Sequence, residues 1–378
     1  MKFGFTEEQD EFRTVLRRFM EEKSPSTEVR RLMETDEGCN QQVWRQLGQE
    51  LGLTAIHIPE VYGGQGFGFV ELGIALEEMG RTLLCAPFFS STVLAATAIL
   101  NAGSEEQKRA LLPAIATGET VATLAFTEDN GLWDGTGVEL TAIASGDGFL
   151  LDGAKSFVLD GHTADLIVVL ARRPGTTGDQ GLSLFTLEGK AAGLERRLLK
   201  SVDATRKLAR LEFSSVHATL LGEEGAAAAP LAKTLSQAAA CLACEMVGGA
   251  EKLRESALEY SLMRMQFGRA IGSFQAIKHK SVDMLVDVEL AKSAAYYAVD
   301  AAAQDDDDLP AVASLAKASA SEAYMQAAID TIQIHGGIGF AWDNDTHLWF
   351  KRAKSSEVFL GDPAYHRELM MQHMAAEQ

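Results

Sequence analysis

The chain has 378 residues, a formal net charge of −19 and a hydrophobic content of 47%. This length exceeds what one small core can bury and predicts two or three packed sub-domains, while the composition is ordinary for a soluble globular protein. The acidic balance argues against binding of nucleic acids or anionic membranes, which require clustered Lys and Arg. It is compatible with a polyanionic cofactor, because a few local cations can hold a phosphate.

The N-terminal residues do not resemble a signal peptide, since they lack an apolar core and turn acidic at Glu7. No apolar run reaches the roughly 18–20 residues of a membrane span. Cys241 and Cys244 have CxxC spacing, but they sit in an Ala-rich helical run without a second pair of metal ligands. We therefore expect ordinary helix residues there, no metal site, and a cytoplasmic location.

Residues 6–120 have a helical pattern. Apolar side chains recur at spacings of three and four, as between Phe12 and Phe19. A Gly-rich loop at residues 59–66 interrupts this pattern, and residues 72–81 resume it. The segment predicts an N-terminal helical domain over residues 1–120.

Residues 121–222 have a different texture, in which short β-rich runs alternate with Gly- and Pro-containing turns. We expect a compact β-domain of about 100 residues. The predicted strands are residues 121–127, 149–151, 166–171, 182–187 and 211–216.

The rest of the chain, residues 223–378, is predicted to be helical, with long helices over 231–265, 275–304 and 310–334. The four aspartates at 305–308 are interpreted as a solvated loop, because consecutive carboxylates repel and cannot all converge on one ion. The predicted fold class is therefore α+β, mostly α, with the order helices, β-domain, helices.

Two segments suggest a ligand site. Arg264 precedes a Gly-containing turn, and Gln275 opens the next helix. An Arg beside such a turn and a helix N-terminus suits a pyrophosphate, although a surface Arg at a helix C-terminus explains the segment equally well. The second segment, Gln333 to Phe340, ends a helix with three glycines within four positions, more than a simple cap requires.

Several motifs, taken in order and spacing, resemble the acyl-CoA dehydrogenase family. These are the RxxFG…Q segment at 264–275, QIHGGIGF at 333–340, IPEVYGGQGFG at 58–68 and ELGIALEEMGR at 71–81. LPAIATGETVATLAFTE at 112–128 resembles the family's entry into its middle domain, and residues 202–206 resemble a later family segment. The resemblance covers nearly the whole chain.

The resemblance implies an N-terminal helical domain, a middle β-barrel-like domain and a C-terminal four-helix bundle. It implies FAD bound at a subunit interface and an acyl-CoA substrate from fatty acid or steroid catabolism. The implied chemistry is proton abstraction next to a thioester carbonyl and hydride transfer from the β carbon to the flavin. Electron-transfer flavoprotein is the implied acceptor. The cofactor would be the hydride sink, whereas a carboxylate base must come from protein.

The usual base is missing. The family's Tyr-Glu-Gly-Thr-like segment, counted without gaps from Gly339, falls on residues 359–362, and the base position is Leu360. Some members carry the base on the helix before the FG turn, where this chain has Ala238. Glu357 lies three residues before Leu360, and Glu245 lies two helical turns after Ala238. Glu245 is a weak candidate base, and pairing with a nearby cation is the preferred interpretation.

The two loops that, by the resemblance, would face the flavin of the same chain also differ from the family's motifs. The family's Thr-Glu-Pro-Gly-(Ala)-Gly-Ser-Asp loop reads TEDNGLWD at 127–134, and Trp-Ile-Thr-Asn-Gly reads FVLDG at 157–161. The threonine that would bond the flavin ring is Leu159. In the family, residues like those retained here contact the FAD of the neighbouring chain. The retained set is Arg264, Phe267, Gln275, Gln333, Gly336 and Gly337.

This sorting suggests the non-catalytic partner of an α2β2 heterotetramer, resembling the base-lacking subunits of bacterial heteromeric dehydrogenases of the steroid side-chain type. A second, related chain would carry the base and most of the FAD site. Three alternatives stay open: a self-sufficient homotetramer with Glu245 as base, a flavin monooxygenase on the same scaffold, and a structural paralogue without FAD.

Overall fold

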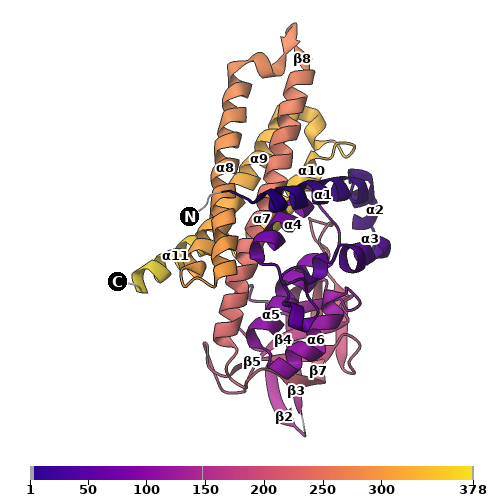
Figure 1. The fold of residues 1–378 in the computed structure, drawn as a ribbon, viewed down its shortest axis with the longest axis vertical. Coiled ribbons are helices and arrows are strands. Elements are labelled where there is room, and N and C mark those ends of the chain that lie inside the picture. Colours follow the sequence, from indigo (N-terminus) through magenta and orange to yellow (C-terminus); the bar gives the residue numbers. More distant parts are fainter. Residues whose placement is uncertain (1–3, 147, 377–378) are drawn as a thin grey trace. The chain divides into compact units, whose positions relative to one another are not determined.

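The computed structural model describes residues 4–146 and 148–376, which divide into two compact units (Figure 1). Unit 1 contains the chain up to residue 30, residues 69–84 and the chain from residue 239 onward. Unit 2 contains residues 31–68 and 85–238. The two units cut across the boundaries at residues 120 and 222, so the predicted three-domain division stays a prediction.

Unit 1 is helical. The helix α2 (Ser26–Met33) begins in this unit and α7 (Ala228–Met263) ends in it. A short hairpin of β8 (Met265–Gln266) and β9 (Arg269–Ala270) joins α7 to the next helix, through a 3-10 turn at Ile271–Ser273. The other helices are α1 (Glu7–Lys23), α4 (Phe69–Thr82), α8 (Gln275–Gln304), α9 (Leu309–His335), α10 (Thr346–Val358) and α11 (Pro363–Ala376).

The ends of these helices follow local chemistry. Thr6 and Gln9 form a capping box at the start of α1. Asp305 takes a left-handed conformation, with φ of 54°, and ends α8. Gly336, with φ of 66°, ends α9 and leads into a 3-10 turn over Gly336–Phe340. The predicted long helices at 231–265, 275–304 and 310–334 are therefore confirmed to within a few residues.

The helices α4 and α7 cross at very short range, and two glycines permit it. A Cβ on Gly80 would lie 2.0 Å from the carbonyl oxygen of Glu245, and a Cβ on Gly248 would lie 2.0 Å from that of Glu77. Backbone atoms cannot yield as a flexible side chain can, so any larger residue forces the helices apart. Gly73 lies on α4 as well, and the atoms nearest to a Cβ added there belong to the side chains of Cys244, at 3.1 Å, and Val299, at 3.2 Å.

Unit 2 combines short helices with a seven-stranded sheet. Its helices are α3 (Gln41–Arg45), α5 (Thr97–Ala102) and α6 (Glu105–Ala116), with π-helical turns at Gln46–Glu50 and Phe89–Ala96 and 3-10 turns at Leu53–Ala55 and Glu60–Tyr62. Its strands are β1 (Ala122–Ala125), β2 (Thr141–Ser145), β3 (Gly148–Leu159), β4 (Leu166–Arg172), β5 (Leu182–Glu188), β6 (Leu194–Leu198) and β7 (Leu208–Leu221).

The sheet closes on itself. Its order is β1-β4-β2-β3-β7-β5, and β5 also pairs antiparallel with β4, so five strands form a ring. The closing contact between β2 and β4 is a single parallel pair, Thr141 with Arg172. The predicted order of helices, β-region and helices is therefore present, and the β-region is barrel-like.

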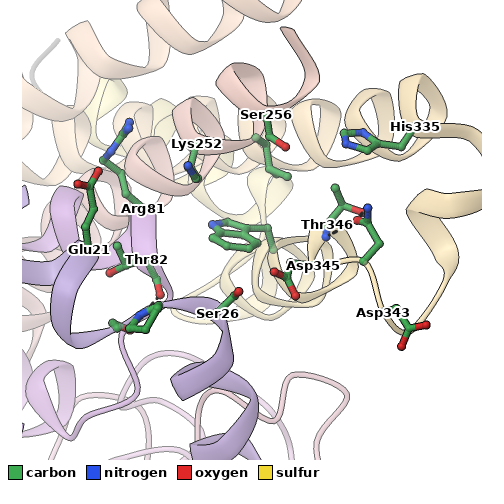
Figure 2. A pocket seen from close by; sticks show the side chains of 15 residues that line it. Glu21, Ser26, Arg81, Thr82, Lys252, Ser256, His335, Asp343, Asp345 and Thr346 are labelled. Carbon is green, nitrogen blue, oxygen red and sulfur yellow. Dashed lines mark hydrogen bonds between the residues drawn. The ribbon is translucent and has the colours of Figure 1, made fainter. Parts of the chain in front are cut away.

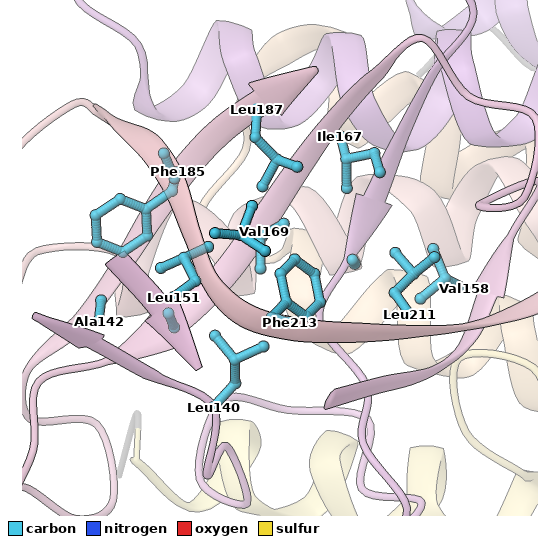
Figure 3. Close-up of a cluster of buried hydrophobic side chains, with 14 of the residues drawn as sticks. Leu140, Ala142, Leu151, Val158, Ile167, Val169, Phe185, Leu187, Leu211 and Phe213 are labelled. Carbon is cyan, nitrogen blue, oxygen red and sulfur yellow. The ribbon is translucent and has the colours of Figure 1, made fainter. Parts of the chain in front are cut away.

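The interior of this ring is filled by alternate residues of its strands (Figure 3). Ile167 and Val169 on β4 lie beside their partners Leu187 and Phe185 on the neighbouring strand β5, and all four side chains point into the core, as expected when side chains alternate between the two faces of a strand. All five of the strands predicted from sequence are present. The sequence patterns miss β2, because only one of its side chains is buried, and the edge strand β6, because its residues are mostly polar.

We predict that Gly248→Ala destabilises the protein by about 3 kcal/mol, because the new methyl group must displace the backbone of α4. Thermal or urea unfolding of the variant measures this loss. Gly73→Ala is the matched control, since it adds the same methyl group against side chains that can shift. Equal stabilities for the two variants would contradict the proposed backbone contact.

Candidate functional site

The position expected for the base lies in a turn between α10 and α11. Leu360 is only 4% exposed and has a left-handed backbone, with φ of 61°. The imidazole of His366 donates from Nε2 to the Leu360 carbonyl oxygen at 2.9 Å. Leu360 therefore offers neither a proton acceptor nor a solvent-facing side chain.

A buried lysine donates hydrogen bonds to the backbone of the same turn. Lys317 is fully buried in α9, and its Nζ donates to the carbonyl oxygens of Glu357 at 3.1 Å and Gly361 at 2.9 Å. The side chain of Glu357 belongs to the last turn of α10 and pairs with Lys354. These contacts fix the backbone at residues 357–361 without supplying a catalytic carboxylate.

Glu245 is the weak candidate base, and it lies inside the bundle. Its side chain is buried, with the residue 7% exposed, and its Oε1 accepts a hydrogen bond from Nη1 of Arg352 on α10 at 2.7 Å. A proton on Glu245 would weaken its attraction to the buried guanidinium. Ala238, the alternative base position on α7, is fully buried.

The six predicted cofactor-binding residues are all exposed on unit 1. Arg264 follows the last residue of α7, and Phe267, 90% exposed, stands at the tip of the β8–β9 hairpin at one end of α7 and α8 (Figure 1). Gln275 opens α8. The remaining three residues, Gln333, Gly336 and Gly337, form the end of α9 and the turn beyond it.

Local conformation keeps these groups open. Phe267 and Gly268 both have positive φ, of 52° and 78°, as expected for the two-residue turn of a tight hairpin. A Cβ added at Gly336 or Gly337 would meet no atom within 4 Å. Nothing in the described part of unit 1 fills the space in front of this Gly-rich turn, so a ligand can approach its backbone closely.

The loop at residues 127–134 of unit 2 is tied back to the β-domain. The Glu128 carboxylate accepts hydrogen bonds from Lys155 Nζ at 2.7 Å and from the backbone N–H groups of Glu139 and Leu140. Burial lowers the pKa of Lys155 to about 8, against the opposing effect of Glu128. The side chain of Leu159 is buried. A flavin ring would find apolar carbon at this position.

Three family models match consecutive parts of the chain. The N-terminal domain of acyl-CoA dehydrogenases matches residues 6–119, the middle domain matches residues 123–216 and the C-terminal domain matches residues 224–375. The chain belongs to the acyl-CoA dehydrogenase family. This assigns it to a family of FAD-dependent oxidoreductases that act on acyl-CoA.

Individual relatives agree with this assignment. Acyl-CoA dehydrogenase IpdE2 of Mycobacterium tuberculosis is 32% identical over 89% of this chain and 87% of its own. Butyryl-CoA dehydrogenase of Megasphaera elsdenii has a similar structure, with a TM-score of 0.93, 26% identity and coverage of 99% and 100% of the two chains. A variant of the steroid ACAD Tcur3481-Tcur3483 superimposes with a TM-score of 0.88, at 30% identity and 98% coverage of each chain.

The residues fit FAD in part. In this acyl-CoA dehydrogenase chain, the exposed Arg264 guanidinium and the open Gly336–Gly337 turn suit a diphosphate and its neighbouring sugar. The cavity beside the loop of unit 2, about 280 Å³, is instead lined by the carboxylates of Glu128, Asp129 and Glu139. Glu128 and Asp129 are paired with Lys155 and Arg210. No Lys or Arg among the described residues lines this cavity, so it offers a phosphate no free cation, whereas the exposed Arg264 lies on unit 1.

The supporting residues Lys155, Lys317 and His366 were not predicted from the sequence. Both lysines stand in apolar stretches, and a charge in such a stretch signals burial with a partner. Among the described residues, no group of three or more His, Cys, Asp and Glu side chains could hold a metal ion. In that same part of the chain, no helix is long and apolar enough to cross a membrane.

Burial and the nearby Lys317 cation lower the pKa of His366 from 6.5 to about 4. Because the folded-state pKa is the lower one, the stabilisation is complete above pH 6.5 and is lost as the pH falls toward 4. We expect the free energy of unfolding to fall over this window by up to about 3 kcal/mol from this residue.

His366→Gln checks this expectation, because its amide can still donate to the Leu360 carbonyl oxygen but does not titrate. Urea unfolding at several pH values should give a shallower pH dependence for the variant than for the native chain. Parallel curves would mean that His366 does not carry the effect.

Proposed function

We propose that this chain is the non-catalytic subunit of a heteromeric FAD-dependent acyl-CoA dehydrogenase and contributes to FAD binding across the subunit interface. One observation carries the proposal. The retained cofactor-binding residues are all exposed, whereas the two base positions, Leu360 and Ala238, are buried and apolar. A chain with its own complete site would need a carboxylate at one of these positions.

The roles of the retained residues follow from their chemistry. The Arg264 guanidinium would hold the diphosphate through charge-assisted hydrogen bonds. The Gln333 amide and the backbone of the Gly336–Gly337 turn would bond the adenosine half, and Phe267 would pack on it. FAD, when bound, supplies the hydride acceptor. This chain's contribution is therefore orientation and charge compensation rather than proton transfer.

The partner is a related chain that carries the base, in an α2β2 heterotetramer. The likeness to the steroid ACAD Tcur3481-Tcur3483, whose name joins two gene products, supports this assembly. The substrate would be an acyl-CoA of fatty acid or steroid catabolism, the electron acceptor an electron-transfer flavoprotein, and the location the cytoplasm. The absence of a carboxylate at Leu360 would leave the desaturation step to the partner.

Expression alone and with the related chain tests this proposal. We expect the chain alone to purify with well under one FAD per subunit and without dehydrogenase activity, and the co-expressed complex to be yellow and active. Within the complex, Arg264→Met should weaken FAD retention by roughly 10- to 100-fold, because one charge-assisted contact is lost.

Arg18→Met is the matched control, since Arg18 is an exposed cation on α1 that belongs to none of the retained motifs. Its FAD content should equal that of the native complex. A chain that purifies alone with one FAD per subunit and full activity would refute the heteromeric proposal.

Glu245 provides the sharpest test against a self-sufficient enzyme. If its role is the ion pair with Arg352, then Glu245→Gln and Arg352→Gln should each lower the melting temperature and leave turnover of the complex within about threefold. Turnover and thermal unfolding are measured on both variants.

A base role predicts a different split. Glu245→Gln would then abolish turnover while FAD stays bound, and Arg352→Gln would retain most of the activity. That result would favour the homotetrameric alternative. Oxygen consumption by the reduced flavin of the native complex would point instead to a monooxygenase.

A further inference from the structure

Unit 1 contains a cavity that the proposed function does not use (Figure 2). Its volume is about 480 Å³, within the roughly 300–1,000 Å³ of small-molecule sites. Residues from the starts of α2 and α10, from the middle of α7 and from the ends of α4 and α9 line it, and we call it the α2–α7–α10 cavity. None of the six predicted FAD contacts is among its lining residues.

Lys252 of α7 is the distinctive group in its wall. It forms no hydrogen bond or ion pair with any residue that the structure describes. Other cations nearby are committed, since Arg81 pairs with Glu255 at 2.6 Å, and Arg254 and Lys292 both pair with Glu251. In a chain with a net charge of −19, a half-buried cation left unpaired beside a cavity points to an anionic ligand.

Two aromatic side chains add a surface for a planar group. Trp349 lines the cavity, is 8% exposed, and its indole Nε1–H has no acceptor among the described residues. His335 also lines the cavity, and its Nδ1 faces the Thr331 carbonyl oxygen at 2.8 Å. In neutral His335, Nδ1 therefore carries the proton and Nε2 is left as an acceptor. The Trp349 N–H and the His335 Nε2 suit the edge of a heterocycle, whereas one face of the His335 ring is already stacked on Tyr260, with ring centroids 4.2 Å apart.

The start of α2 supplies further positive potential. Ser26 opens this helix and lines the cavity, so the positive end of the helix dipole lies at its wall, while the N–H of Glu28 is already bonded to the Pro25 carbonyl oxygen. Of the carboxylates, Asp345 is already paired with Arg30 at 2.8 Å, and Glu21 and Asp343 are exposed to solvent. The groups of the wall that are shielded from solvent and have no partner among the described residues, chiefly the Lys252 ammonium and the Trp349 N–H, are thus mainly hydrogen-bond donors.

We infer that the α2–α7–α10 cavity binds a phosphate monoester with a planar organic group, of the nucleoside monophosphate class. Lys252 and the start of α2 bind the phosphate, and Trp349 and His335 contact the planar group. A bare phosphate ion would leave most of the cavity unfilled, which is why the ligand carries an organic part. The inference does not depend on the heteromeric function.

Calorimetric titration of the full-length protein, as purified, with adenosine monophosphate tests the inference. We expect one saturable site per chain, with tighter binding than inorganic phosphate and no binding of adenosine at the same concentrations. Lys252→Gln should weaken binding by roughly 10- to 100-fold. Trp349→Phe, which keeps a ring and loses the N–H donor, should weaken it several-fold less than Lys252→Gln.

Because adenosine monophosphate is one half of FAD, Arg264→Gln separates the two sites. This variant should bind the probe as the native chain does. Binding lost in Arg264→Gln and kept in Lys252→Gln would overturn the inference, since the probe would then occupy the flavin site. The absence of saturable binding to a correctly folded native protein would overturn it as well.

Discussion

The close crossing of α4 and α7 is the constraint on which unit 1 depends. Gly80 and Gly248 bring the backbones of the two helices together, each against a carbonyl oxygen of the other. This contact fixes α7, and with it the direction of Glu245 toward α10. The ion pair from Glu245 to Arg352 then holds α10 against α7. The two glycines thereby help to determine the position of α10, the helix that precedes Leu360, where the base was expected.

The backbone of the turn at Leu360 is held without any carboxylate side chain. Lys317 and His366 bind the backbone carbonyl oxygens of residues 357, 360 and 361, and none of these contacts involves a side chain of the turn. Leucine can therefore occupy position 360 while the backbone keeps its conformation. The hydrogen bonds that stabilise the turn do not depend on which side chain occupies position 360.

Unit 1 carries two kinds of positive group with different surroundings. Arg264 is exposed beside a Gly-rich turn with open space in front of it, whereas Lys252 is half-buried in a cavity with aromatic walls. Exposure suits contact with a cofactor held by another chain, and partial burial suits a small ligand held by this chain alone. Because the rest of the surface is acidic, it disfavours anions, and an anionic ligand is expected to bind only near these cations.

The sequence by itself determined the order of helices and strands, the barrel-like region and the family, because hydrophobic periodicity and glycine punctuation are local properties. It also predicted two cofactor-binding segments, at residues 264–275 and 333–337, and the structure shows that the predicted contact residues in them are exposed. Only the tertiary structure decided that Glu245 pairs with Arg352, that Lys317 and His366 hold the turn at Leu360, and that Lys252 lines a cavity. Those contacts join residues 6 to 107 positions apart or depend on several helices at once, and no local pattern encodes such a meeting.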